Sequence, residues 1–380
     1  MKATKRISPK TKSNVYAVIM AGGRGTRFWP LSRPHRPKQL LKILSSKSLI
    51  RETVDRVLSL NDRQNTLVVT VSDHISLVRK ELPMLPKSNF IVEPQGKNTA
   101  PCIGLAALEL ASRDPNAIMI ILPSDHWISD LKSFFRTIKD AVGLVQRYDS
   151  LVTIGIRPSF PETGYGYILK EKKIKGPRGV PAYRVKGFHE KPTLKKAGLL
   201  IQRGSLWNSG IFVWKASTLL ASLGRFIPPI LHGLDRIKAE AKGSGLSTLR
   251  PKLQAVIRRE YKKMPNISID HAVLEKAGSE GKVLTLEAKF AWSDVGNWDA
   301  VHKMLPQDKS GNAGVGKWLG LKSSDCLIYS PKRLVALLGM KDAVIIDTPD
   351  ALLIGDIKRS QEVKDLVDEL ERKGYGRHTS

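Results

Sequence analysis

Short apolar runs alternate with longer amphipathic segments between residue 15 and about residue 160. The apolar runs cover residues 15–20, 66–71, 89–93, 117–122 and 151–156. Between them, residues 48–60 and 100–112 repeat apolar side chains at helical spacing. Continuous apolar strands that alternate with helices are typical of a mainly parallel sheet covered on both faces. The pattern predicts an α/β fold with a doubly wound, Rossmann-like sheet.

The pattern changes after Pro306. Shorter strand-like runs follow at residues 326–330, 333–339, 343–347 and 351–356. They lead into a predicted closing helix that is apolar on one face, with Ser360 as its N-cap. We therefore divide the chain into a basic tail at 1–14, a large domain at 15–305, and a small β-rich domain with a terminal helix at 312–380. The small domain is predicted to be structural or oligomeric, with a homodimer as the candidate assembly.

Composition narrows the class of protein. Hydrophobic residues make up 41% of the 380 residues and charged residues 26%, which is ordinary for a soluble globular protein. No apolar run approaches about 18 residues, so we expect no membrane span. The first 14 residues carry five Lys or Arg and no acid, without the apolar stretch of a signal peptide. We expect a disordered basic tail and a cytoplasmic protein.

The net charge of +28 invites a nucleic-acid hypothesis. However, the Lys and Arg residues are scattered, aromatic residues make up only 6%, and no helix-turn-helix, zinc-finger or RNA-binding motif is visible. We therefore expect no specific nucleic-acid partner. A polyanionic small substrate accounts for part of the charge.

A glycine-rich loop follows the first apolar run. Its candidate nucleotide-binding residues are Ala21, Gly22, Gly23, Gly25 and Thr26, and Arg27 comes next. Glycine leaves backbone N–H groups uncovered for an anion, and arginine presents donors that match phosphate oxygens. The spacing fits neither the dinucleotide fingerprint nor the P-loop, so the loop taken alone also fits a flexible turn. Lys38 stands eleven residues after Arg27. Two cations beside such a loop suit a triphosphate, which makes Arg27 and Lys38 the candidate catalytic residues.

Two separated aspartates are candidates for a metal site. Asp125 ends the fourth apolar run, and Asp294 stands between a strand-like and a helical stretch. Mg²⁺ takes one or two protein carboxylates and completes its shell with phosphate oxygens and water. Asp125 could instead cap a helix. The neighbouring His126 is a tempting general base, but a histidine in this position is more often a packed residue, so we assign it no role.

Three later segments predict a polar pocket. They supply Tyr165 and Gly166 from PETGYGY, Glu190 and Lys191 from FHEKP, and Asn208 from WNSGIFVW. Carboxylate and amide oxygens bind sugar hydroxyls, and a neighbouring lysine binds a sugar phosphate. Each segment alone also fits a solvated loop.

These motifs together resemble a known family. VIMAGGRGTRFWPLS, PKQLL, EPQGKNTAP, LPSDHWI, PETGYGYI, EKP, WNSGIFVW, SIDHAVLEK and WSDVGNW occur in this order. The order is similar to that of the bacterial mannose-1-phosphate guanylyltransferases, which are sugar-phosphate nucleotidyltransferases. The resemblance is strong over residues 15–305, which would be the catalytic domain. Two departures, Ser124 and His189, fall outside the expected ligands. A cupin-like isomerase domain does not follow, so we expect no isomerase activity.

The resemblance implies transfer of GMP from GTP to mannose 1-phosphate with Mg²⁺. The glycine loop and Arg27 would hold the leaving pyrophosphate, and Lys38 would stabilise the transferring group. Asp125 and Asp294 would hold the metal, and the polar pocket would hold the sugar phosphate. A guanylyltransferase for another manno-configured sugar phosphate, such as a heptose, remains an alternative. A non-catalytic nucleotide-sugar sensor and a basic RNA-binding protein are the others.

The segment EPQGKNTAP supplies the candidates for the base. Glu93 is its first polar side chain, and Asn98 and Thr99 are further nucleotide-binding candidates. Guanine presents two adjacent donors that a carboxylate can accept together. We therefore expect Glu93 to read guanine, although it could also cap the following helix or be solvated.

Overall fold

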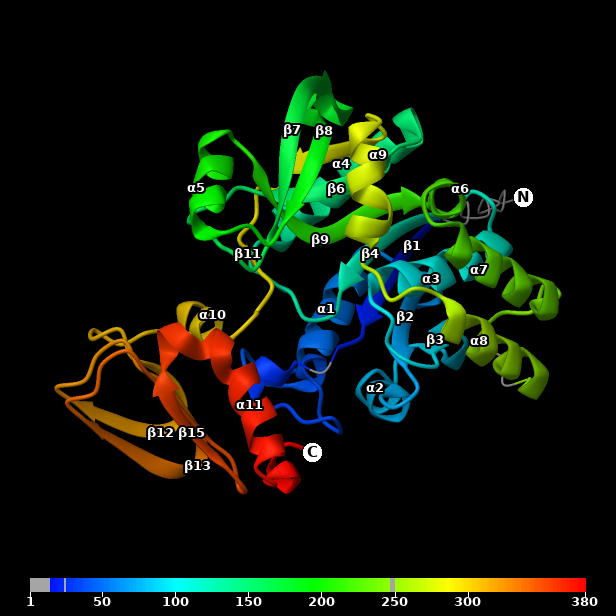
Figure 1. Cartoon of the computed structure of the whole chain (residues 1–380). Helices are drawn as coiled ribbons and strands as arrows, with labels where there is room; N and C mark the ends of the chain where they lie inside the picture. The colour runs from blue at the N-terminus through cyan, green and yellow to red at the C-terminus, as the bar shows by residue number, and fades with distance from the viewer. Residues whose placement is uncertain (1–13, 24, 247–249) are drawn as a thin grey trace, which may run out of the picture.

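The computed structural model describes residues 14–23, 25–246 and 250–380. Of the predicted basic tail at 1–14, only Asn14 belongs to this part, and the rest lies outside the described residues. Figure 1 shows a large sheet flanked by helices, with a second sheet set to one side. Within the described ranges, every helix is too short or too polar to cross a lipid bilayer.

The large sheet has nine strands among the described residues, and it mixes parallel and antiparallel pairs. From one edge to the other they are β3 (Phe90–Glu93), β2 (Thr66–Val71), β1 (Val15–Ala21), β4 (Ile118–Pro123), β9 (Leu206–Lys215), β6 (Leu151–Ile156), β10 (Val283–Glu287), β8 (Pro181–Glu190) and β7 (Gly166–Lys175). Strands β3, β2, β1 and β4 are parallel, as are β6 and β10. Strands β9, β8 and β7 pair antiparallel with their neighbours. The expected mainly parallel sheet is therefore found in one half, and the half that follows β4 needs a correction.

Side chains of the apolar strands alternate between two cores. In β1, Tyr16 and Val18 belong to one cluster of buried residues, whereas Ala17, Ile19 and Ala21 belong to the other. The first core is covered by α3 (Thr99–Arg113), α6 (Ala216–Phe226), α7 (Pro228–Ala241), α8 (Pro251–Lys263) and α9 (Glu275–Ser279). The second is covered by α1 (Leu49–Leu58), α2 (Ile75–Glu81), α4 (Leu131–Tyr148) and α5 (Leu194–Gln202). Burial on both faces explains why these strands read as continuous apolar runs.

Polar side chains at the helix starts explain where these helices begin. Ser48 accepts a hydrogen bond from the Arg51 backbone N–H and starts α1, as the 48–60 pattern predicts. Asp130 caps α4 in the same way, through Ser133. Local side-chain chemistry therefore fixes where these two helices begin.

The C-terminal part forms a separate sheet. It contains β12 (Ala313–Leu321), β13 (Leu327–Leu338), β14 (Ala343–Asp347) and β15 (Leu352–Asp356), and α11 (Val363–Arg372) follows. The two runs predicted at 326–330 and 333–339 are one strand, β13, because both pair with β12 across a bulge. Ser360 is not the N-cap of α11. It lies in the 3₁₀ turn Ile357–Glu362, and its hydroxyl accepts a hydrogen bond from the Asp299 N–H.

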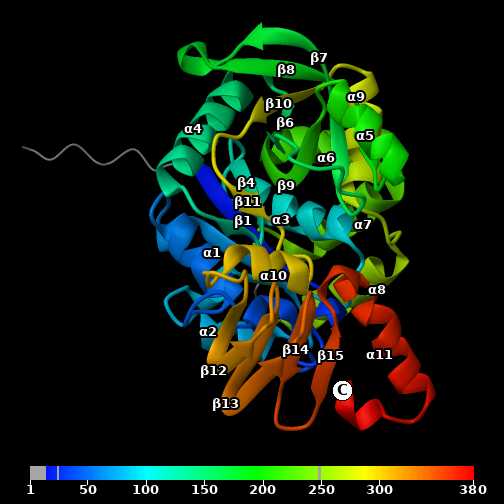
Figure 2. The same ribbon diagram turned by 90° about the vertical axis from the view of Figure 1, so that its left-hand side faces the viewer.

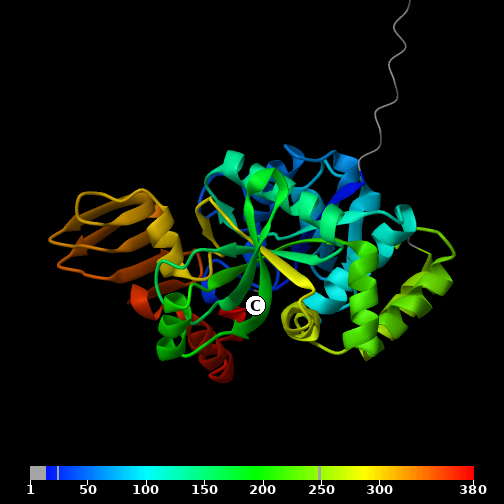
Figure 3. The same cartoon turned by 90° about the horizontal axis from the view of Figure 1, so that it is seen from above.

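A third core joins the second sheet to the segment after β1. Phe28 and Trp298 are fully buried there, together with side chains of β13, β14 and α11. The Trp29 indole also donates to the His378 carbonyl at 2.7 Å. Figure 2 shows α10 (Trp298–Met304) between the two sheets, and Figure 3 shows the second sheet on the side away from the green helices α6 to α8. The C-terminal part therefore supports the chain directly after the glycine loop.

Candidate active site

One cleft runs across the carboxyl ends of β1 and β4. It consists of three cavities of about 270, 780 and 490 Å³. The first two share Arg27 and Asp294 in their walls, and the last two share Thr99 and Asp270. The three cavities therefore adjoin one another. We call the 270 Å³ cavity the phosphate end and the two others the sugar end.

The phosphate end is lined by the glycine loop. Its wall includes Gly22, Gly23, Gly25, Thr26, Arg27, Lys38, Asp125 and Asp294, all of them residues singled out from the sequence. The N–H groups of Gly22 and Gly23 have no acceptor among the described residues. Gly25 has φ of +68°, and a Cβ atom there would clash with the Cβ of Lys38. Glycine is therefore required at this position both by its backbone conformation and by the close approach of Lys38.

Lys38 is fixed between the two aspartates. Its ammonium lies 2.6 Å from Asp125 Oδ2 and donates to the backbone carbonyl of Asp294 at 2.8 Å. Only 12% of the Lys38 side chain is exposed. Burial would raise the pKa of Asp125, but the adjacent Lys38 outweighs it and holds that pKa below the ordinary value. The Asp125 carboxylate and the Asp294 carbonyl therefore hold the Lys38 ammonium at a defined position.

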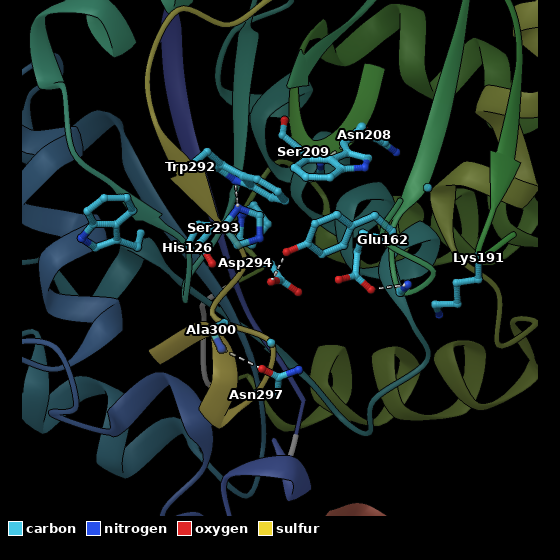
Figure 4. A pocket seen from close by; sticks show the side chains of 18 of the residues that line it. His126, Glu162, Lys191, Asn208, Ser209, Trp292, Ser293, Asp294, Asn297 and Ala300 are labelled. Atoms are coloured by element: carbon cyan, nitrogen blue, oxygen red, sulfur yellow. Dashed lines mark hydrogen bonds between the residues drawn. The ribbon is translucent and has the colours of Figure 1, made fainter. Parts of the chain in front are cut away.

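Asp294 connects the two ends of the cleft. The Tyr165 hydroxyl donates to its Oδ1 at 2.7 Å, and burial together with this carboxylate raises the Tyr165 pKa. Figure 4 shows Asp294 between His126 and Glu162. Among the described residues, no three His, Cys, Asp or Glu side chains gather as a protein-only metal cage. Two carboxylates beside a phosphate loop fit a magnesium ion that takes its other ligands from phosphate and water.

The sugar end presents carboxylates and an amide. The Asn208 side chain donates to Asp270 Oδ1 at 2.7 Å and accepts from the Thr153 hydroxyl at 3.2 Å. Burial, followed by the negative charge of Glu190, raises the pKa of Asp270 to about 6. Gly166 lines the same cavity, and a Cβ there would touch Glu190 Oε2. The arrangement offers several hydrogen-bond acceptors to a polyhydroxylated ligand.

Lys191 lies at the outer edge of the sugar end, and its side chain is 67% exposed. Its backbone has φ of +44°, and its ammonium is 3.6 Å from Glu190 Oε1. Asn98 and Thr99 line the neighbouring cavity at the start of α3, where Asn98 is the N-cap. The predicted polar pocket is thus assembled from segments far apart in the sequence.

His126 belongs to an aromatic wall. It accepts a hydrogen bond from the Trp292 indole at 3.1 Å, and the two rings meet edge to face (Figure 4). Burial lowers the pKa of His126 to about 4 despite the two nearby aspartates. The ring therefore packs against Trp292 and also lines the 780 Å³ cavity, and we still assign it no role.

The family models match both parts of the chain. The model described as Nucleotidyl transferase covers residues 16–311. The model described as MannoseP isomerase/GMP-like beta-helix domain covers residues 316–370.

The curated relatives carry one name repeatedly. A mannose-1-phosphate guanylyltransferase of Escherichia coli is 37% identical over 371 residues, which is 95% of this chain and 75% of the relative. The chain belongs to this nucleotidyl transferase family. The xanthan biosynthesis protein XanB of Xanthomonas campestris is 35% identical, with 97% of this chain and 75% of that protein covered. The family resemblance drawn from the sequence motifs is confirmed.

A solved structure agrees with the family. The crystal structure described as a mannose-1-phosphate geranyltransferase from Thermus thermophilus superposes with a TM-score of 0.83 at 31% identity. The match covers 94% of this chain and all of the other. Both the large sheet and most of the C-terminal part therefore share the fold of a solved relative.

Two residues predicted to bind the nucleotide do not line the cavities of the cleft. Glu93 is only 3% exposed, lines none of the cavities of the cleft, and accepts a hydrogen bond from the Tyr261 hydroxyl. Burial raises its pKa to about 7. Ala21 is also buried, as the last residue of β1, and its carbonyl accepts from the Thr70 hydroxyl. Glu93 needs a correction, because its carboxyl is committed to the core between β3 and α8.

The structure also places residues in the cleft that the sequence did not identify as site residues. Asp270 stands in SIDHAVLEK, a motif that supports the family resemblance, but nothing in its spacing indicates that it faces Asn208. Trp207 and Trp292 line the cavity and contact Tyr165 edge to face. Gln361 and Lys364 come from the C-terminal part. An amphipathic pattern alone places Lys364 on a solvated helix face, so only the fold reveals its position.

Proposed function

We propose that this nucleotidyl transferase transfers GMP from GTP to α-D-mannose 1-phosphate and forms GDP-mannose and pyrophosphate. The observation that carries the proposal is that the cavity of the cationic glycine loop adjoins a carboxylate-rich pocket at Asp294. The names of the relatives supply the identity of the sugar and the base. The two ends suit a triphosphate and a sugar phosphate respectively.

The reaction needs positioning more than acid or base chemistry. A phosphate oxygen of the sugar phosphate attacks the α-phosphorus of GTP, and the bond from that phosphorus to the α,β-bridging oxygen breaks. The attacking oxygen is already anionic at neutral pH, so no general base is required. A neutral His126 agrees with this scheme. The protein contributes by aligning the two substrates and by neutralising charge.

The phosphate end would hold the leaving pyrophosphate. The N–H groups of Gly22 and Gly23, which have no acceptor within the described part of the chain, and the exposed Arg27 are available to its oxygens. Lys38 would stabilise charge on the transferring phosphoryl group, because its ammonium is held in place before the substrate arrives. Asp125 and Asp294 would hold Mg²⁺, which neutralises phosphate charge when bound.

The sugar end would select the acceptor. Glu190, Asp270 and Asn208 present oxygens to sugar hydroxyls, and the exposed ammonium of Lys191 is available to the sugar phosphate. Tyr165 and Gly166 form the wall between this pocket and Asp294. Hydroxyl stereochemistry would be read here, since a buried acceptor left without a donor costs free energy.

Product formation tests the proposal. Purified protein is incubated with GTP, Mg²⁺ and mannose 1-phosphate, and GDP-mannose and pyrophosphate are measured together. We expect equal amounts of both, and little product when UTP or dTTP replaces GTP or when glucose 1-phosphate replaces the acceptor. If product formed with a heptose 1-phosphate but not with mannose 1-phosphate, the acceptor would be the heptose phosphate. Binding of GDP-mannose without turnover would indicate a sensor.

A further inference from the structure

The C-terminal part contributes a cation to the phosphate end. Lys364, in the first turn of α11, lines the 270 Å³ cavity together with the glycine loop, Lys38 and Asp125. Gln361, one turn earlier, lines the adjoining 780 Å³ cavity. The cleft is therefore built from both parts of the chain, although the sequence predicts only a structural or oligomeric role for the second part.

The helix that carries Lys364 is firmly placed. Val363 and Val367 are 6% and 4% exposed and belong to the same core as Phe28, which directly follows the glycine loop residues Thr26 and Arg27. The 3₁₀ turn before the helix is tied to α10 through the Ser360 hydroxyl. The red helix lies beside the blue segment after β1 in Figure 1. Lys364 thus starts from a fixed backbone next to the loop.

Lys364 is available for an external anion. Among the described residues it forms no ion pair, although Asp368 stands one turn away on the same helix. Neighbouring basic residues are occupied: Lys358 pairs with Asp342, and Lys373 pairs with Glu369. An exposed lysine that lines a cavity and has no carboxylate partner there is suited to bind an anionic ligand.

The side-chain charges at the phosphate end leave room for such a residue. Lys38 is already paired with Asp125, and the carboxylate of Asp294 lies in the same wall. Among the described lining residues, the positive charges of Arg27 and Lys38 therefore only balance the negative charges of the two aspartates. Lys364 adds the positive charge that exceeds this balance. A leaving pyrophosphate carries several negative charges, so an additional fixed cation lowers the cost of its release from the α-phosphorus.

We propose that Lys364 is a further substrate-binding residue, whose ammonium binds the β- and γ-phosphate oxygens of GTP and the pyrophosphate formed from them. The proposal rests on the proposed function, in that it assigns the phosphate end to the triphosphate. It also gives the C-terminal part a direct role in the reaction, because removal of α11 would remove one ligand of the leaving group.

Binding of magnesium pyrophosphate by calorimetry tests the proposal without turnover. We expect Lys364→Ala to weaken binding roughly tenfold, the scale of one charge-assisted hydrogen bond at a partly screened site, and Lys364→Arg to restore most of it. Lys373→Ala, at the far end of the helix, is the matched control and should bind as the wild type does. Melting temperatures of all variants report whether α11 stays packed.

Kinetics supply the second readout. Lys364→Ala should raise KM for GTP about tenfold, again the scale of one charge-assisted bond, while KM for mannose 1-phosphate stays unchanged. Pyrophosphate binding equal in wild type and Lys364→Ala overturns the inference, as does an equal rise of both KM values. A wild type that binds no pyrophosphate overturns it too. If the wild type binds pyrophosphate through Lys364 but forms no GDP-mannose, the proposed function fails and the phosphate site stands.

Discussion

The two ends of the cleft differ in how their charges are arranged. At the phosphate end, opposite charges are already paired: Lys38 contacts Asp125 and the Asp294 carbonyl, and Gly25 allows the loop to approach closely. At the sugar end, acids lie close together, and burial followed by the negative charge of Glu190 raises the pKa of Asp270. The arrangement at the phosphate end fixes the Lys38 ammonium for the highly charged triphosphate. The arrangement at the sugar end provides acceptors that donors of a neutral sugar can satisfy.

The difference predicts different kinetic signatures. Loss of a preorganised cation should affect the rate of transfer, because the interaction strengthens as charge develops in the transition state. Loss of an acceptor at the sugar end should affect substrate binding more than the rate of the bound complex. Variants at the two ends can therefore separate the roles.

The largest effect is expected for Lys38→Ala. Transfer should slow by about 10²–10³ in kcat, the usual scale for losing one preorganised electrostatic stabiliser. The substitution also leaves Asp125 without its partner, so Lys38→Ala combined with Asp125→Asn should be less damaging than the two effects multiplied. Steady-state kinetics measure both. The exposed Lys42→Ala is the matched control. A Lys38→Ala variant with altered melting temperature but unchanged kcat/KM would make the lysine structural.

A smaller loss is expected for Gly25→Ala. The added methyl group meets Lys38, and the backbone must hold φ of +68°, which side chains with a Cβ rarely adopt. Displacement of Lys38 should lower kcat by roughly ten- to a hundredfold, because a misplaced stabiliser keeps only part of its effect. Gly204→Ala, at a positive φ with open space around it, controls for backbone strain alone. Equal activity of the two alanine variants would exclude the close approach as the cause.

Asp270→Asn tests the sugar end. KM for mannose 1-phosphate should rise about tenfold, the scale of one lost hydrogen bond to a charged group, while kcat changes little. The variant also reports on pH. The folded protein holds the Asp270 proton more tightly than the unfolded chain, so the free energy of unfolding falls as pH rises from about 4 to about 6.

In Asp270→Asn the part of this decrease that Asp270 contributes should be absent, whereas the part that Glu93 contributes should remain. Denaturant unfolding at pH 4, 5, 6 and 7 measures it, and the exposed Asp235→Asn is the control. A parallel pH dependence in the wild type and Asp270→Asn would show that Asp270 ionises normally and that the crowding of acids is not the distinguishing feature of this end.

The smallest effect on specificity is expected for Glu93→Gln. Because its carboxyl faces Tyr261 in the core, the ratio of kcat/KM for GTP and UTP should stay unchanged. The pH dependence of stability should change instead: as pH rises from 4.5 toward about 7, the wild type should lose more free energy of unfolding than the variant, in which the Asp270 contribution remains but the Glu93 contribution is gone. A smaller ratio of kcat/KM for GTP to kcat/KM for UTP in the variant would show that Glu93 recognises the base after all.

Sequence patterns correctly predict those features that depend on residues close together in the chain. Strand and helix positions follow from apolar periodicity and from caps such as Ser48, and the phosphate end follows from glycine, Arg27 and Lys38 placed after strands. Such patterns carry no information on strand direction, so the antiparallel insertion of β9 beside β4 was not predicted. Glu93 shows the same limit. Its position after a strand indicates the correct edge of the sheet, but only tertiary packing turns the side chain toward Tyr261.

Direct transfer in one step is the central claim, and the configuration at the α-phosphorus tests it most directly. GTP made chiral at the α-phosphorus by sulfur substitution is converted with mannose 1-phosphate, and the configuration of the resulting thio-GDP-mannose is determined by phosphorus NMR. In-line attack by the sugar phosphate, with pyrophosphate leaving toward the glycine loop, predicts inversion. Retention would reveal a covalent nucleotidyl intermediate on a protein side chain and would contradict the account.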